Sequence, residues 1–304
     1  MVEFAVALKQ EGYDLDVFVS DCAPNVAALH TASEATPLIL PPVLADTDAY
    51  IEALFDACRT QGIDLVVPLS NFDLQALAFA KDRFHNAGIT VVVSNPEMIS
   101  DSLDKRRTSI RCQKHGLPVP EAFDAPDAVC DRFPCVRKDR FGNSGAGFQV
   151  VNSTQDLLGF ESDKEILQKY IEGTEYGLDV LNDFEGHFVA MCAKKKIDMR
   201  AGETDRCEVV NFPALYGLGQ AIAEAFGHIG NMDVDVISDQ NGKFYCLDFN
   251  PRFGGGYPAS HLAGMNFLRA IIDMAQGTPL RLPEVPSKIV LMKGISLHST
   301  EAAA

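Results

Sequence analysis

Nine residues set the interpretation of this chain: Asp248-Phe249-Asn250-Pro251-Arg252-Phe253-Gly254-Gly255-Gly256. They follow residues 242–247, a β-rich segment after an Asn-Gly turn, so a strand is expected to lead into them. Residues two apart on a strand face the same side, which brings together the side-chain oxygens of Asp248 and Asn250. Oxygen ligands beside the Arg252 cation suit a hard divalent metal and the phosphate that it carries. A strand end followed by an Asn-Pro turn and a loose loop is the alternative.

The preceding strand carries acidic residues in alternation. Asp233 and Asp235 alternate with apolar residues, and a short turn at 238–243 leads to the next strand. Antiparallel pairing would bring an aspartate opposite Asp248 and Asn250. Two carboxylates and an amide carbonyl, with an arginine beside them, make a plausible site for Mg²⁺ bound to phosphates.

The composition describes an ordinary globular protein. The 304 residues exceed what one core usually holds, so two or three subdomains are expected. A net charge of −16 argues against nucleic acid or an anionic membrane as the main partner. There is no apolar run of membrane-spanning length and no signal peptide, and the eight cysteines form no Cys-x-x-Cys pair, which favours a reducing cytoplasm.

The N-terminal third predicts a parallel sheet flanked by helices. The pattern indicates helices at 2–11, 48–61 and about 72–86, and strands at 15–20, 63–69 and 89–93. Such a domain usually opens on a strand, so we expect the first strand and its glycine-bearing turn to be missing; a sheet that is one strand short is the alternative. A nicotinamide-linked dehydrogenase would carry Gly-x-Gly-x-x-Gly in that turn.

The middle of the chain offers two lysines for a phosphate. Ser102 is the expected N-cap of a helix that ends near Gly116, and Lys105 lies in its first turn, either as a phosphate ligand or as a solvated side chain. Lys138 lies on a strand at 133–140 that enters a glycine-rich loop at 141–147. This loop is not a Walker A motif, but a glycine hairpin can lay backbone N–H groups over phosphates as a lid. An ordinary hairpin is the alternative.

The C-terminal half is expected to be α+β with mostly antiparallel strands. The expected strands are 165–171, 175–181, 187–196 and 232–237, with a polar loop at 198–208 and a helix at 215–226. Arg200, Glu203 and Arg206 lie in that loop, where solvated side chains are the simplest interpretation.

In this order the segments resemble the ATP-grasp superfamily of carboxylate–amine ligases, nearest the carbamoyl-phosphate-synthase-like branch, over nearly the whole chain. The resemblance implies a parallel-sheet domain at 1–101, a small lid subdomain at 102–171 and a metal-binding subdomain at 172–304. It implies nucleotide contacts from Lys105, Lys138, Ser144, Gly145, Gly147, Gln168, Lys169, Tyr170, Ile171 and Glu175, metal ligands Asp235, Asp248 and Asn250, and catalytic roles for Arg252, Lys138 and Asn250. Two ligands depart from the pattern, because the family usually has glutamate at position 248 and glutamate or glutamine at 235. Asp139 also replaces the proline that the family usually has after the second lysine. The resemblance further implies that Arg200, Glu203 and Arg206 border the substrates and that Gly254–Gly256 bind the far end of the acid through backbone.

The implied function is that of an ATP-dependent cytoplasmic ligase with Mg²⁺, or Mn²⁺ in its place. A small-molecule carboxylate attacks ATP to give an acyl phosphate, and an amine then displaces phosphate; a homodimer is the assembly considered. The shorter aspartate ligands leave open a catalytically weakened ATP-binding protein. A nicotinamide-linked oxidoreductase is the third hypothesis, without a supporting fingerprint.

Overall fold

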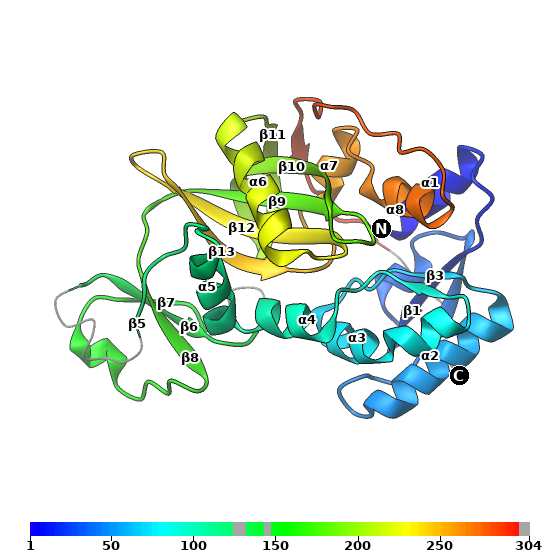
Figure 1. Cartoon of the computed structure of the whole chain (residues 1–304), viewed down its shortest axis with the longest axis horizontal. Helices are drawn as coiled ribbons and strands as arrows, with labels where there is room; N and C mark the ends of the chain where they lie inside the picture. The colour runs from blue at the N-terminus through cyan, green and yellow to red at the C-terminus, as the bar shows by residue number, and fades with distance from the viewer. Residues whose placement is uncertain (124–131, 143–146, 298–304) are drawn as a thin grey trace. The chain divides into compact units, whose positions relative to one another are not determined.

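The computed structural model of the chain describes residues 1–123, 132–142 and 147–297 (Figure 1). Its contacts divide the chain into two compact units. The first contains residues 1–92, 266–281 and the C-terminal residues from 293, and the second contains 93–265 and 282–292. The subdomain boundaries expected near 101 and 171 fall inside the second unit and stay predictions. In the described part of the chain, no helix is long and apolar enough to cross a membrane.

The first unit has the expected alternation of helices and parallel strands. Its helices are α1 (Val2–Gln10), α2 (Thr47–Gln61), α3 (Asn71–Asn86) and α8 (Phe267–Ala275), with a 3-10 turn at Ala27–His30. Its strands are β1 (Val17–Asp21), β2 (Ala35–Ile39), β3 (Leu65–Val66) and β4 (Thr90–Val91). Strand β1 pairs with β2, and β3 with β4, both in parallel. The strands are shorter than the apolar runs indicated, and β2 was not expected.

Glycine and apolar periodicity define the helices of this unit. Helix α2 ends at Gly62, whose φ of 70° is the left-handed conformation that glycine adopts at low cost. Leu8 of α1 packs on Leu268 and Ile272 of α8, and the Tyr13 hydroxyl donates to Asp273 at 2.9 Å. Residues far apart in the sequence therefore close one core.

The second unit contains two antiparallel sheets. The four-stranded sheet has the order β5-β8-β6-β7 and the six-stranded sheet the order β13-β12-β9-β10-β11-β14. These strands are β5 (Ala122–Phe123), β6 (Cys135–Asp139), β7 (Gln149–Val151), β8 (Glu165–Lys169), β9 (Gly173–Asn182), β10 (Phe188–Arg200), β11 (Glu203–Val210), β12 (Gly230–Asp239), β13 (Phe244–Asn250) and β14 (Val290–Met292). The helices are α4 (Pro96–Leu103), α5 (Lys105–Lys114), α6 (Pro213–Phe226) and α7 (Tyr257–Leu262), with a 3-10 turn at Thr154–Leu157. The α+β expectation is confirmed.

Two expectations for this unit are wrong. Ser102 is not an N-cap, because it lies inside α4 and its hydroxyl donates to the Met98 carbonyl at 3.0 Å. Asp104 caps α5 instead, by accepting from the backbone N–H of Arg106 and Arg107. Aspartate is as good an N-cap as serine, so the sequence offered both choices two residues apart.

The second error concerns the polar loop at 198–208. Most of these residues belong to strands, because β10 extends to Arg200 and β11 begins at Glu203. Ion pairs across the hairpin, Arg200 with Asp205 and Arg206 with Asp198, let charged side chains occupy paired strands. Charge alone was therefore a poor guide to loop structure here.

Period-two alternation on β12 separates the core from the charged face. Met232, Val234 and Val236 are fully buried, while the intervening Asp233 and Asp235 keep contact with a cavity on the other face. Phe226 of α6 stacks on Phe249 of β13 with ring centroids 4.6 Å apart, so the helix covers the apolar face. Packing on one face thus fixes the direction of the acidic side chains on the other.

Candidate functional site

The second unit holds a cavity of about 600 Å³ that residues of both its sheets line. This volume suits a ligand of nucleotide size together with a smaller molecule. The predicted residues that line it are Lys105, Lys138, Gln168, Lys169, Tyr170, Ile171, Glu175, Asp235, Asp248, Asn250 and Arg252. Gly147 is described but does not line the cavity, and Ser144 and Gly145 lie outside the described residues.

Strands β12 and β13 place the oxygen-bearing side chains in register. Asp235 lies directly opposite Asp248, and Asp233 opposite Asn250, as the alternation predicted. A register irregularity follows Asp235, so the pairing changes immediately beside the acidic positions. The expectation of an aspartate opposite each of Asp248 and Asn250 is confirmed.

The acidic hairpin concentrates negative charge. Burial, together with the neighbouring carboxylate of Asp235, raises the pKa of Asp233 to about 7. The Lys196 ammonium lies 2.6 Å from Asp235. Burial disfavours the charge on Lys196, but the carboxylates of Asp235 and Glu175 outweigh it and raise the pKa of Lys196 to about 12. Arg252 reaches Asp233 at 3.4 Å and also donates to the Phe253 carbonyl at 2.9 Å.

Two lysines come from the side of the small sheet. Lys138 on β6 donates to the Leu247 carbonyl at 3.3 Å, and burial lowers the pKa of Lys138 to about 8, although Asp248 opposes this. Lys105 begins α5 and donates to the Gly142 carbonyl at 2.9 Å. The Asp104 carboxylate holds Arg140 through two hydrogen bonds of 2.8 and 2.6 Å, which ties the start of this helix to the end of β6.

The segment from β8 to β9 forms another wall. Residues 168–171 line the cavity, and the Lys169 N–H donates to the Glu121 carbonyl at 2.8 Å. Glu175 on β9 accepts from Lys196 at 3.5 Å. Apolar lining from Val136, Ile237 and Leu247 makes this end less polar than the acidic hairpin.

A buried ion pair on the strands next to the acidic hairpin was missed. Lys194 on β10 pairs with Asp179 on β9, and both side chains are almost completely buried. The Ser260 hydroxyl also donates to Asp179 at 2.5 Å. Burial disfavours the charge on Lys194, but Asp179 and Asp233 outweigh it and raise the pKa of Lys194. A carboxylate within the apolar run of β9 was the available signal, since a buried charge requires a partner.

Two parts of the chain match families of known proteins. Residues 161–296 match a family model described as ATP-grasp in the biosynthetic pathway with Ter operon, and residues 2–92 match the PylC-like N-terminal domain. The predicted resemblance to the ATP-grasp superfamily is therefore confirmed. The chain's similarity to a carbamoyl-phosphate synthase from Methanobrevibacter smithii, at 23% identity over 87% of this chain and 78% of that protein, supports the carbamoyl-phosphate-synthase-like branch.

Solved structures share the ATP-grasp fold. Biotin carboxylase from Campylobacter jejuni, solved as a complex named with beta-gamma-ATP, superposes with a TM-score of 0.72 at 19% identity, covering 91% of this chain and 69% of that one. L-amino acid ligase from Bacillus licheniformis gives 0.68 at 17% identity, covering 91% and 71%. Identities this low support the fold alone.

The donor set fits the metal that ATP-grasp proteins use. Asp235, Asp248 and Asn250 offer only oxygen atoms from adjacent strands, which suits Mg²⁺ or Mn²⁺ rather than a metal that prefers sulfur or imidazole. The raised pKa of Asp233 has the neighbouring carboxylate among its causes, which is the repulsion that a bound cation would relieve. The residues present therefore fit a divalent cation.

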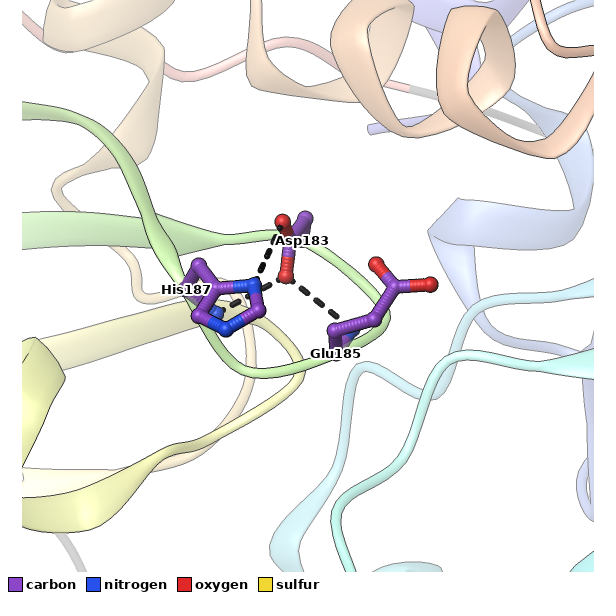
Figure 2. A group of neighbouring side chains, drawn as sticks. All are labelled: Asp183, Glu185 and His187. Carbon is purple, nitrogen blue, oxygen red and sulfur yellow. Dashed lines mark hydrogen bonds and ion pairs between the residues drawn. The ribbon is translucent and has the colours of Figure 1, made fainter.

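A second group with metal-ligating side chains is explained by the fold. Figure 2 shows Asp183, Glu185 and His187 at the turn between β9 and β10. Asp183 accepts the backbone N–H of Glu185 at 3.0 Å and of His187 at 2.8 Å. Its carboxylate therefore stabilises a tight turn, as aspartate often does.

Proposed function

We propose that the chain is an ATP-dependent ligase that activates a small-molecule carboxylate as an acyl phosphate for attack by an amine. One observation carries this proposal: a single cavity gathers Lys105, Lys138 and the paired acidic strands β12 and β13. Cations and a metal-binding hairpin around one space are what a nucleoside triphosphate requires. The ATP-grasp fold supports the same reading.

We assign ATP to this cavity, along its full length. The backbone of residues 168–171 would bind the adenine, and Glu175 would hold the ribose. Lys105 and Lys138 would contact the phosphates, and residues 143–146 of the predicted glycine-rich lid lie outside the described residues. Lys138 suits this role because phosphate oxygens would restore the charge that burial disfavours.

Asp235, Asp248 and Asn250 would hold the metal. A bound Mg²⁺ would neutralise charge on the ATP phosphates and on the leaving group. Arg252, two residues beyond Asn250, would place its positive charge beside the ATP phosphates. The residues of this chain act by position and charge, and no covalent bond to the protein is required.

The reaction has two displacements. A carboxylate oxygen attacks the γ-phosphorus, the bond to the β-phosphate oxygen breaks, and ADP leaves. The amine nitrogen then attacks the acyl carbon, phosphate leaves, and the amine proton passes to solvent or phosphate.

One observation favours a second candidate, a nucleotide-binding protein of weakened activity. Asp235 already pairs with Lys196 at 2.6 Å, and both aspartates are one methylene shorter than glutamate. In that case ATP would bind without turnover.

The partners that we propose for the ligase are a small-molecule carboxylate and an amine, and a homodimer is the proposed assembly.

A direct assay separates these candidates. The chain is incubated with Mg-ATP and a mixture of carboxylates and amines, and ADP and phosphate are measured. The ligase predicts ADP release that depends on added carboxylate and falls about 100-fold or more in the Asp248→Ala, Asn250→Ala double variant. ADP release that persists in this variant would refute the metal-site assignment, and ATP binding without any turnover would favour the weakened protein.

A further inference from the structure

Strand β10 carries three consecutive lysines, at positions 194–196. Neighbouring residues of a strand face opposite sides, so Lys194 and Lys196 line the cavity while Lys195 does not. Lys194 is held by Asp179 on the adjacent strand β9. The Lys196 side chain is only 8% exposed, so its ammonium group is fixed inside the site rather than free in solvent.

The Lys196 ammonium joins two carboxylates that serve different ligands in the proposed site. It lies 2.6 Å from Asp235 Oδ1 and 3.5 Å from Glu175 Oε2. Asp235 on β12 is the proposed metal ligand, and Glu175 on β9 is the proposed ribose contact. A nucleotide places its phosphates between its ribose and the metal. Lys196 therefore lies where the phosphates of a bound nucleotide would pass.

Gly177 provides the space for the lysine side chain to cross from β10 to β12. It lies on β9 opposite both Lys194 and Asp235, in one row across three strands. A Cβ atom on Gly177 would lie 3.5 Å from Lys194 Cε and 3.9 Å from Lys196 Cε. Both lysine stems thus pass against the backbone of Gly177, where a longer side chain would fill the space. The contact of Lys196 with Asp235 is consequently built into the sheet.

A divalent cation would compete with Lys196 for Asp235. Because both carry positive charge, each weakens the binding of the other to a shared carboxylate. Nucleotide phosphates supply negative charge for both, since they ligate the metal and accept hydrogen bonds from an ammonium group. The metal and Lys196 therefore compete without a nucleotide and can both be accommodated with one.

We propose that Lys196 couples metal binding to nucleotide binding: its ammonium group competes with the metal for Asp235, and nucleotide phosphates accept the ammonium group and leave Asp235 to the metal. The proposal rests on the nucleotide and metal sites of the proposed function. It requires no turnover, so it applies to the ligase and to the weakened protein alike. Because linkage is reciprocal, the bound metal also raises the affinity for the nucleotide.

Removal of the ammonium group should change two affinities in opposite directions. In Lys196→Met, Mn²⁺ affinity without nucleotide is expected to rise about 10-fold, because Asp235 loses the competing cation. ADP affinity without metal is expected to fall about 10-fold, because a cation beside the phosphates is lost. The EPR signal of unbound Mn²⁺ measures the first affinity. Calorimetric titration of the intact chain with ADP in the presence of EDTA measures the second.

Two further variants are the controls. Lys195→Met makes the same chemical change one residue away, at a side chain that does not line the cavity, and should leave both affinities unchanged. The double variant Lys196→Met, Asp235→Asn should lose the gain in Mn²⁺ affinity, because the carboxylate that the lysine releases is then absent. Circular dichroism establishes that each variant is folded.

The outcomes separate this proposal from the general function. A general loss of structure would lower both affinities, whereas the coupling predicts that one rises and the other falls. Mn²⁺ affinity that is unchanged or lower in Lys196→Met would overturn the coupling, as would a gain that persists in the double variant. ADP release with carboxylates but without the opposite changes would leave the ligase intact and remove the coupling. The opposite changes in a chain that activates no acid would support the coupling and overturn the ligase.

Discussion

Single residues at alternate strand positions create the site. On β12 the same chain segment contributes Val234 to the core and Asp233 and Asp235 to the cavity, so one strand performs both tasks. The alternation was visible in the sequence, and so was the pairing with Asp248 and Asn250. The ion pair of Lys194 with Asp179 was not, because the two residues are not direct register partners: Asp179 lies opposite Cys192, and Lys194 opposite Gly177.

His228 gives the chain a predicted sensitivity to acid. This ring is fully buried, with one nitrogen 2.9 Å from the Val180 carbonyl, and burial lowers the pKa of His228 to about 4. The unfolded chain binds a proton near pH 6.5, so stability is complete above that pH and falls as the pH drops toward 4. The loss between pH 7.5 and 5 should be on the order of 2 kcal/mol from this residue.

Urea denaturation at both pH values measures this effect. His228→Gln should show a smaller loss of unfolding free energy on acidification than the wild type. His187→Gln, at a ring that is 77% exposed, should behave as the wild type. Equal pH dependence in wild type and His228→Gln would contradict the assignment of a neutral buried imidazole.

At the scale of elements, helices with strong apolar periodicity were predictable from the sequence. Strands whose charged side chains pair across a hairpin were not. Helices α2, α3 and α6 were expected within two residues of their observed bounds, because apolar spacing and flanking glycines indicate them. The strands β10 and β11 were assigned partly to a loop, since their charges are neutralised only across the hairpin. The cap of α5 was misplaced because Ser102 and Asp104 both fit a cap by sequence.

Glycine has two opposite roles in these elements. Gly173 begins β9, and a Cβ atom there would overlap the Ser238 carbonyl of β12. Gly217 lies inside α6, and a Cβ atom there would meet nothing within 4 Å. Gly173→Ala should therefore destabilise the chain by about 2 kcal/mol or more, because two backbones must separate. Gly217→Ala should stabilise it by up to about 1 kcal/mol through helix propensity.

Chemical denaturation of the two alanine variants tests this contrast. The pair share the same chemical change, so the sign of the difference reports the surroundings alone. A stable Gly173→Ala variant would mean that β9 and β12 do not approach as closely as the register indicates.

At the scale of the whole molecule, the two sheets of the second unit together supply a set of charged groups that neither sheet holds alone. The small sheet contributes Lys138 and the large sheet the acidic hairpin, and both line one cavity. The order of the segments that resemble the ATP-grasp family predicted this combination of a lysine with acidic side chains. The identity of the acid depends on the shape of the pocket that binds it, which the order of these segments does not predict.

Transfer of ¹⁸O from the acid to the released phosphate tests the central claim, carboxylate activation by ATP, most directly. A mixture of carboxylic acids, including amino acids, is labelled with ¹⁸O at the carboxyl group and incubated with the chain, Mg-ATP and amines. An acyl phosphate requires one ¹⁸O atom to pass from the acid to each released phosphate, so we predict singly labelled phosphate, lost in Asp248→Ala, Asn250→Ala. Phosphate released without ¹⁸O, at the same rate with and without acids, would contradict carboxylate activation.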